Sequence, residues 1–154
     1  MSTPLEDLLS PERVLCRVPG HSKKRTLQSI GERLAPALPE GARDSDVVTG
    51  LLLERERLGS TALGDGVAIP HARHEACPAP LGVVCTLSDG IEFDAPDALP
   101  VDLLFALLVP AEGVQEHLEL LAALAGRFRQ RHFRERLRAA ADGTELVLAF
   151  SDPA

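Results

Sequence analysis

The feature that most constrains the fold of this chain is a nearly uninterrupted apolar run, Val101–Val109, with the sequence VDLLFALLV. Asp102 is its only polar residue. A run of this length is too short to cross a bilayer as a helix. Near-continuous apolar residues are typical of a central strand that other elements cover on both faces. The sequence therefore predicts a β-sheet buried between two layers.

Two amphipathic helices are predicted before this strand. Ser22 can cap the first helix, whose apolar residues recur at spacings of three and four. The second helix is expected to begin near Asp44 or Ser45 and to end before the turn-prone segment Gly59–Thr61. The apolar positions are Leu27, Ile30, Leu34 and Leu38 in the first helix, and Val47, Val48, Leu51, Leu52 and Leu58 in the second.

The chain after the apolar run is predicted to be helical. One helix should extend from Gln115 to about Arg129, and a basic amphipathic piece should follow near His132 to Ala140. Thr144 is expected to cap a last short helix. The residues expected to be buried in the first of these helices are Leu118, Leu121, Leu124, Ala125 and Phe128.

Further short strands are predicted at Val67–Ile69, Gly82–Leu87 and Ile91–Phe93. The last two surround a turn at Ser88–Gly90, which indicates a hairpin. Helices, then strands, then helices around one buried strand define an α/β fold, a mixed β-sheet of about five strands flanked by helices in an α/β sandwich. We expect a single domain over residues 1–154, with its core at about residues 5–150.

Composition excludes several classes of partner. The net charge of −7 and the scattered distribution of the 16 Lys and Arg residues argue against nucleic acid binding. Only 3% of residues are aromatic, and none is Tyr or Trp, which removes the usual stacking surfaces for bases and sugar rings. Three cysteines without C-x-x-C spacing are typical of reduced thiols. The amino terminus lacks the pattern of a signal peptide, so we expect a cytoplasmic protein without membrane insertion.

Residues 58–71, with the sequence LGSTALGDGVAIPH, carry the most specific motif. They resemble the active-site signature of the enzyme IIA domains of the fructose/mannitol class in the bacterial phosphotransferase system. The resemblance continues through Phe93–Ala95, Pro100–Pro110 and His117–Leu118. The stretch from Cys16 to Leu27 resembles the nitrogen-related regulatory branch of that family.

The resemblance implies that His71 accepts a phosphoryl group. Pro70 stops the preceding strand, so His71 is expected just beyond a strand end. A neutral imidazole is a nucleophile near pH 7, and an N–P bond is reactive enough to pass the group onward. The alternative is that His71 is an ordinary surface histidine beside a turn, and the surrounding motif argues against this alternative.

The resemblance also implies functional roles for two further residues, and for each of them a purely structural role remains the alternative. His117, near a helix start, would orient His71 or stabilise the phosphoryl group, or it is a solvated residue beside Glu116. Arg55 would neutralise phosphoryl charge, with Arg57 as a competitor, or both are exposed charges paired with neighbouring glutamates. We expect His71, His117 and Arg55 to converge at one sheet edge among small and apolar residues such as Ala72 and Leu63.

Two other local patterns lie near His71. His71, His74 and Cys77 have the spacing of a helical zinc half-site, but Pro78 and Pro80 favour a loop and no second pair follows. We therefore expect no metal and no other cofactor. Ala72 stands where glycine is common in the family, and a left-handed backbone there would be strained.

The resemblance implies a phosphocarrier that accepts its phosphoryl group from an HPr-like protein and regulates partner proteins according to its phosphorylation state. A sugar-specific IIA component, which passes the phosphoryl group to a IIB component of a fructose- or mannitol-type transporter, is the first alternative. A binding module of the same fold that never carries phosphate is the second. Downstream partners are thus regulatory proteins or a IIB component.

Overall fold

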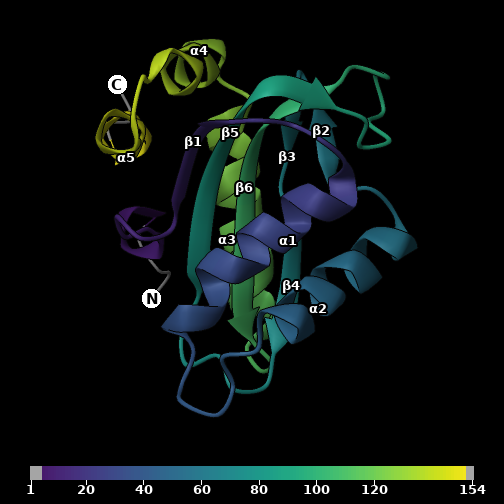
Figure 1. Ribbon diagram of the computed structural model, residues 1–154, viewed down its shortest axis with the longest axis vertical. Helices are drawn as coiled ribbons and strands as arrows, with labels where there is room; N and C mark the ends of the chain where they lie inside the picture. The colour runs from purple at the N-terminus through teal and green to yellow at the C-terminus, as the bar shows by residue number, and fades with distance from the viewer. Residues whose placement is uncertain (1–4, 152–154) are drawn as a thin grey trace.

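In the computed structural model, which describes residues 5–151, the predicted central strand is β6 (Val101–Pro110) in a six-stranded mixed sheet. Figure 1 shows it in the middle of the sheet, between the two helical layers. Of its ten residues, only Asp102 and Pro110 are not buried. The other strands are β1 (Val14–Val18), β2 (Ala62–Gly64), β3 (Val67–Ala68), β4 (His71–His74) and β5 (Leu81–Ile91).

The sheet has the order β1-β5-β6-β3-β2, and β4 also pairs with β6. β3 and β4 both run parallel to β6, so they continue one another along the same side of that strand. β5 is antiparallel to β6 and parallel to β1, while β2 is antiparallel to β3. This mixed arrangement confirms the predicted α/β fold.

The predicted hairpin around Ser88–Gly90 is wrong. One continuous strand, β5, extends from Leu81 to Ile91 and keeps pairing with β6 at Ile91 opposite Val101. The exposed residues 88–90 form a register shift inside the strand instead of a turn. Gly90 permits this because an added Cβ would lie 2.7 Å from the Cβ of Pro100.

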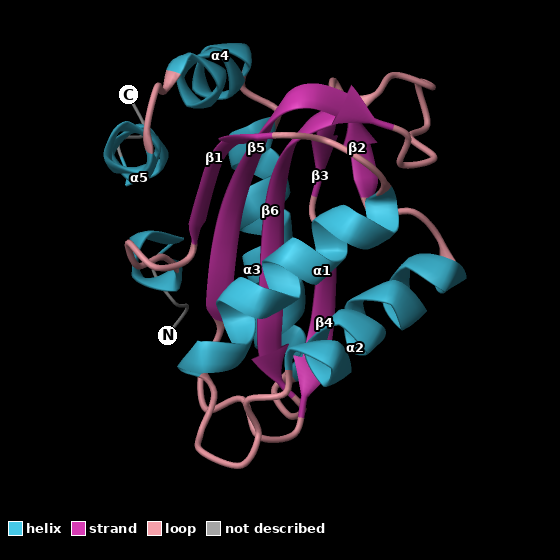
Figure 2. Ribbon diagram, viewed as in Figure 1, coloured by secondary structure: helices cyan, strands magenta, loops and turns pink. Residues whose placement is uncertain are grey.

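Helices cover both faces of the sheet, as Figure 2 shows. α1 (Lys23–Leu34) and α2 (Ser45–Leu58) pack on one face, and α3 (Val114–Phe128) packs on the other. α4 (Arg131–Ala139) and α5 (Gly143–Ser151) extend the second layer. Two short 3-10 helices, Leu5–Leu8 and Ala35–Ala37, complete the elements within the described residues. Each face of the sheet thus has its own hydrophobic cluster.

The helix caps follow the sequence signals in two of three cases. The Ser22 hydroxyl accepts from the Arg25 amide at 3.1 Å, and Asp44 caps α2 through the Asp46 amide. At the last helix the prediction is wrong, because Asp142 and not Thr144 accepts from the Glu145 amide, at 2.9 Å.

The buried face of α3 differs from the predicted one. Its buried residues are His117, Leu120, Leu124 and Phe128, at helical spacings of three and four. Leu118 is 54% exposed, and Leu121 is half-buried. The helix is therefore rotated so that His117 points into the protein and the neighbouring row of leucines faces an open cleft. In α2, Leu58 is likewise exposed.

Within the described part of the chain, no helix is both long and apolar enough to cross a membrane. Residues 1–4 of the amino-terminal segment and residues 152–154 of the expected domain lie outside the described residues.

Candidate active site

His71 is the first residue of β4. The preceding strand β3 does end before Pro70, at Ala68, as expected, but His71 does not lie in a loop because the chain resumes pairing immediately after Pro70. The Pro70 carbonyl accepts from the Leu107 amide at 2.9 Å, and residues 71–74 then pair in register with residues 107–110 of β6. His71 is therefore held by the sheet rather than by a loop.

One nitrogen of the His71 ring is engaged by the backbone. Nδ1 lies 2.9 Å from the Ile69 carbonyl oxygen. A carbonyl oxygen only accepts hydrogen bonds, so Nδ1 carries the proton in the neutral ring. The lone pair of the neutral ring is then on Nε2.

The surroundings of His71 lower its pKa below 6.5. Burial is the largest cause, and the nearby charges of Arg55 and Arg73 act in the same direction. The Ile69 carbonyl and the carboxylate of Glu56 oppose them and raise the pKa. The net effect keeps the ring neutral, and hence nucleophilic, at neutral pH.

His117 lies in the first turn of α3, as predicted, but it is only 7% exposed. Its ring lies beside Gly113, the N-cap residue: a Cβ added there would be 3.6 Å from His117 Nε2, and the φ of 85° suits glycine. Nδ1 of His117 is buried and has no hydrogen-bond partner within residues 5–151. Burial and the charge of Arg73 lower its pKa, while Glu116 raises it. His117 is thus a neutral ring with unused hydrogen-bonding capacity.

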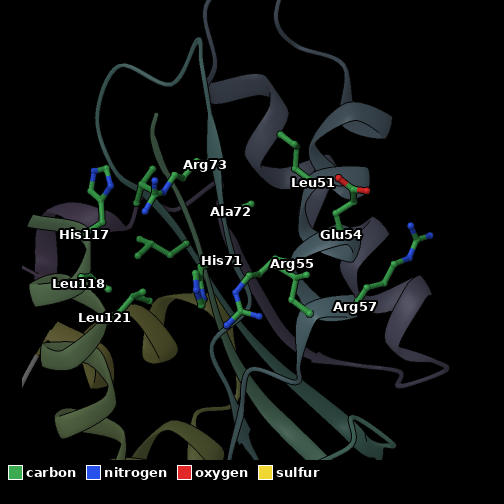
Figure 3. Close-up of a pocket in the computed structure, with 13 residues that line it drawn as sticks. Leu51, Glu54, Arg55, Arg57, His71, Ala72, Arg73, His117, Leu118 and Leu121 are labelled. Carbon is green, nitrogen blue, oxygen red and sulfur yellow. The ribbon is translucent and has the colours of Figure 1, made fainter. Parts of the chain in front are cut away.

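Arg55 lies in the last turn of α2 and caps that helix. Its Nη1 donates to the Gly59 carbonyl oxygen at 2.9 Å. Figure 3 shows the Arg55 side chain beside His71, whereas Arg57 extends away from it. Neither arginine forms an ion pair with its neighbouring glutamate in the described structure, because Glu56 points inward and pairs with Lys23 instead.

The buried Glu56 connects the end of α2 to the start of α1. Its Oε1 lies 3.0 Å from Lys23 Nζ and accepts from the Thr61 amide at 3.2 Å, while its Oε2 accepts from the Thr61 hydroxyl. Lys23 Nζ also lies 4.4 Å from the centre of the Phe93 ring. The Thr61 carbonyl in turn accepts from the Ile69 amide, two residues before His71. These contacts hold the motif segment and Arg55 in a fixed relation to β4.

The three residues predicted from the sequence line one cleft of about 650 Å³ between α2, β4 and α3. Ala72 lines it as well, whereas the predicted neighbour Leu63, on β2, does not. The full lining is Leu51, Glu54, Arg55, Arg57, Leu58, His71, Ala72, Arg73, Leu107, Val109, His117, Leu118 and Leu121.

Arg73 is a residue of this cleft that the sequence analysis missed. It follows His71 by two positions in β4, and the two pair with Leu107 and Val109 of β6, which belong to the cluster on the α3 face. Side chains two apart in a strand point to the same side, so Arg73 shares the cleft with His71. The signal was the spacing His-x-Arg, which becomes informative only once residues 71–74 are known to be a strand.

The other side chains near His71 have local structural roles. Ala72 is buried in β4 and does not adopt the positive φ that would strain it. His74 Nδ1 accepts from the Ala76 amide, and the Cys77 thiol contacts the Ala79 carbonyl. Burial raises the pKa of Cys77, which disfavours a thiolate. No group of three or more potential metal ligands is present within residues 5–151.

A neutral imidazole with a free Nε2, in an open cleft that also contains arginines, defines an acceptor site for an anionic group. Residues 7–152 match the family described as phosphoenolpyruvate-dependent sugar phosphotransferase system, EIIA 2. The chain belongs to this family and is a component of a phosphotransferase system.

Relatives within this family include nitrogen regulatory proteins. That of Pseudomonas aeruginosa is 47% identical over 136 residues, which cover 88% of this chain and 87% of that protein. The crystal structure of nitrogen regulatory protein IIA-Ntr from Neisseria meningitidis has a TM-score of 0.86 and 37% identity, covering 94% of this chain and 97% of that one. A complex of mannitol enzyme IIA with phosphorylated enzyme IIB from Escherichia coli shares the fold, with a TM-score of 0.73, 20% identity and coverage of 93% and 96%.

Proposed function

We propose that this protein accepts a phosphoryl group on Nε2 of His71 from an HPr-like phosphocarrier and then acts on partner proteins according to its phosphorylation state. The observation that carries the proposal is the contact between His71 Nδ1 and the Ile69 carbonyl, which leaves Nε2 as the nucleophile. Arg55, Arg73 and the apolar rim of the cleft suit an anionic group delivered by another protein.

The proposed step is an in-line transfer between two histidines. The Nε2 lone pair of His71 forms a new N–P bond while the N–P bond in the donor breaks, and that electron pair returns to the donor imidazole. Positioning and electrostatic stabilisation supply most of the catalysis in such a reaction. Arg55 would neutralise charge on the phosphoryl oxygens, and His117 would orient or hydrogen-bond the group.

The regulatory assignment is supported by the similarity to nitrogen regulatory proteins over nearly the whole chain. Transfer onward to a IIB component is the alternative, as in the mannitol complex that shares the fold. A binding module that never carries phosphate is the second alternative. We place the protein in the cytoplasm, in line with its three free cysteines.

The test is phosphorylation with purified components. The protein is incubated with phosphoenolpyruvate, enzyme I and the HPr-like carrier, and its intact mass is measured at neutral pH. We expect the wild-type protein to gain one acid-labile, base-stable phosphoryl group and His71→Ala to gain none. His132→Ala, which changes an exposed histidine of α4, is the matched control and should label fully.

Full labelling of folded His71→Ala would contradict the acceptor assignment. An unlabelled wild-type protein would favour the binding module. Adding a IIB protein to the labelled protein separates the remaining alternatives, because rapid loss of the label to IIB is expected only of a sugar-specific component.

A further inference from the structure

Within residues 5–151, two arginines of the cleft, Arg57 and Arg73, have no hydrogen-bond or ion-pair partner, but Arg57 extends away from His71 (Figure 3). Arg73 lies on β4 together with His71. Its side chain is exposed. Arg55, by contrast, is engaged by the Gly59 carbonyl at 2.9 Å. A guanidinium group without a partner among the described residues is available for a ligand.

The strand geometry of β4 directs the side chains of Arg73 and His71 into the same cleft. The two residues occupy positions of β4 that face α3, opposite Val109 and Leu107 of β6. Figure 3 shows the Arg73 side chain extending toward His117, while Arg55 lies next to His71. The two arginines therefore approach the histidine from different elements, α2 and β4.

The charges of the cleft are opposite to those of the whole chain. Three arginines and one glutamate line the cleft, whereas the protein carries a net charge of −7. The charge of Arg73 also lowers the pKa of both His71 and His117, so its field reaches both rings. A dianionic group between these rings would experience that field directly.

We propose that Arg73 is a second phosphoryl-binding residue, which donates hydrogen bonds to the phosphoryl oxygens on His71 from the His117 side of the cleft. This inference rests on the proposed function of His71. Arg55 and Arg73 would then hold the group between two guanidinium forks, and bidentate contacts of this kind fix orientation as well as charge. No bond to Arg73 forms or breaks, so the covalent step remains that of His71.

The experiment uses Arg73→Gln, which removes the charge, and Arg73→Lys, which keeps the charge without the fork. Arg57→Gln is the matched control, because Arg57 lines the same cleft but extends away from His71. Three quantities are measured: the rate of phosphorylation by the HPr-like carrier, the rate with phosphoramidate as a small phosphoryl donor, and the ³¹P NMR titration of the phosphorylated protein. Thermal unfolding checks that each variant is folded.

A hydrogen bond to a charged group changes a rate by roughly 10- to 100-fold, and we expect a decrease of that size for Arg73→Gln with both donors. Arg73→Lys should be slowed less, and Arg57→Gln should match the wild-type protein. The titration of the phosphoryl group should move to higher pH in Arg73→Gln, because a nearby cation favours the dianion.

Slower transfer from the carrier alone, with an unchanged phosphoramidate rate and an unchanged titration, would mean that Arg73 only contacts the carrier and would overturn the proposal. Wild-type behaviour of Arg73→Gln in all three measurements would overturn it as well, while the function of His71 would stand. A wild-type protein that neither donor phosphorylates would contradict both the proposed function and the role of Arg73.

Discussion

His71 is held by a contact that also determines its chemistry. The Ile69 carbonyl fixes the orientation of the ring and selects the nitrogen that carries the proton. The same carbonyl raises the pKa of the ring, but burial and the two arginines outweigh it. The result is a histidine that is both immobilised and neutral, which are the two requirements for a nucleophile in phosphoryl transfer.

A first prediction concerns the pH dependence of this residue. Because the pKa of His71 is below 6.5, the ring should remain a competent acceptor as the pH falls below that value. NMR titration of the His71 ring should give a midpoint below 6.5, and the rate of phosphorylation by phosphoramidate should decline with the same midpoint. A midpoint at or above the ordinary value would contradict the balance of charges described here.

The same shift affects stability, and its sign follows from proton binding. Between the folded and unfolded pKa values, the unfolded chain binds a proton that the folded protein excludes. The contribution of His71 is therefore present above pH 6.5 and is lost as the pH falls through the folded pKa. His117 acts in the same direction, since its pKa is also lowered.

A second prediction tests whether His117 and Arg55 act in phosphoryl transfer or only support the structure. His117→Ala and Arg55→Ala should each slow phosphoryl transfer by roughly 10- to 100-fold, the effect of one hydrogen bond to a charged group. Both variants should remain folded in thermal unfolding: Arg55 caps an exposed helix end, while His117→Ala removes a buried ring and should lower stability without breaking a hydrogen bond of Nδ1. Unchanged transfer rates in both variants would exclude them from the site.

At the residue scale, His71 could be anticipated from the motif at residues 58–71, and His117 and Arg55 from the wider family resemblance. Arg73 could not, because its relation to His71 depends on the backbone being extended between them. The burial of His117 was also missed, since the leucine pattern of α3 permits two neighbouring faces and only packing against the β6 side of the sheet selects one of them.

At the scale of elements, the contact between α1 and α2 supports the site from behind. Lys23 at the start of α1 reaches the buried Glu56 near the end of α2, and Glu56 holds Thr61 ahead of β2. The Glu56 side chain is only 3% exposed, so its charge depends on these partners. This network explains why a segment at residues 22–25 lies close to a motif that begins more than thirty residues later.

A third prediction tests this network. Lys23→Met leaves the Glu56 carboxylate without its cation and should lower the free energy of unfolding by about 1–3 kcal/mol. Lys24→Met, which changes an exposed neighbour, is the control and should be nearly neutral. Denaturant unfolding measures both. Equal stability of the two variants would mean that Thr61 alone compensates the buried charge.

An element could be predicted when its residues form a recognisable pattern along the sequence, such as an apolar run or a helical stripe. β6 was evident because both of its faces are buried, and α1 because its stripe and cap agree. β1 and β2 escaped prediction because they have five and three residues and form the two ends of the sheet order. The residues at 88–90 have turn composition, but the antiparallel partner strand keeps β5 extended through them.

At the scale of the whole molecule, the packed interior around β6 is distinct from the open cleft in which the charge would change. β6 is packed on both faces, by clusters that include α1 and α2 on one side and α3 to α5 on the other. Phosphorylation of His71 would add about −1.5 to −2 charges at a cleft that now contains three arginines. A change of this kind can exchange one protein partner for another at the same face without moving the core.

A fourth prediction follows for the phosphorylated protein. Amide hydrogen exchange should change around β4, the end of α2 and the start of α3, and it should remain the same in β6, because close-packed interiors resist continuous deformation. Affinity for a partner that distinguishes the two forms should differ by roughly 5- to 150-fold. Broad changes of amide exchange in β6 would contradict a local switch and would indicate a global rearrangement.

The central claim is that Nε2 of His71 carries the phosphoryl group, and the most direct measurement is NMR of the phosphorylated protein labelled with ¹⁵N at its histidines. Scalar coupling between phosphorus and a ring nitrogen identifies both the residue and the atom. We predict a single coupled nitrogen, Nε2 of His71, with Nδ1 still protonated and bonded to the Ile69 carbonyl. Coupling to Nδ1 of His71, or to any other histidine, would contradict the account.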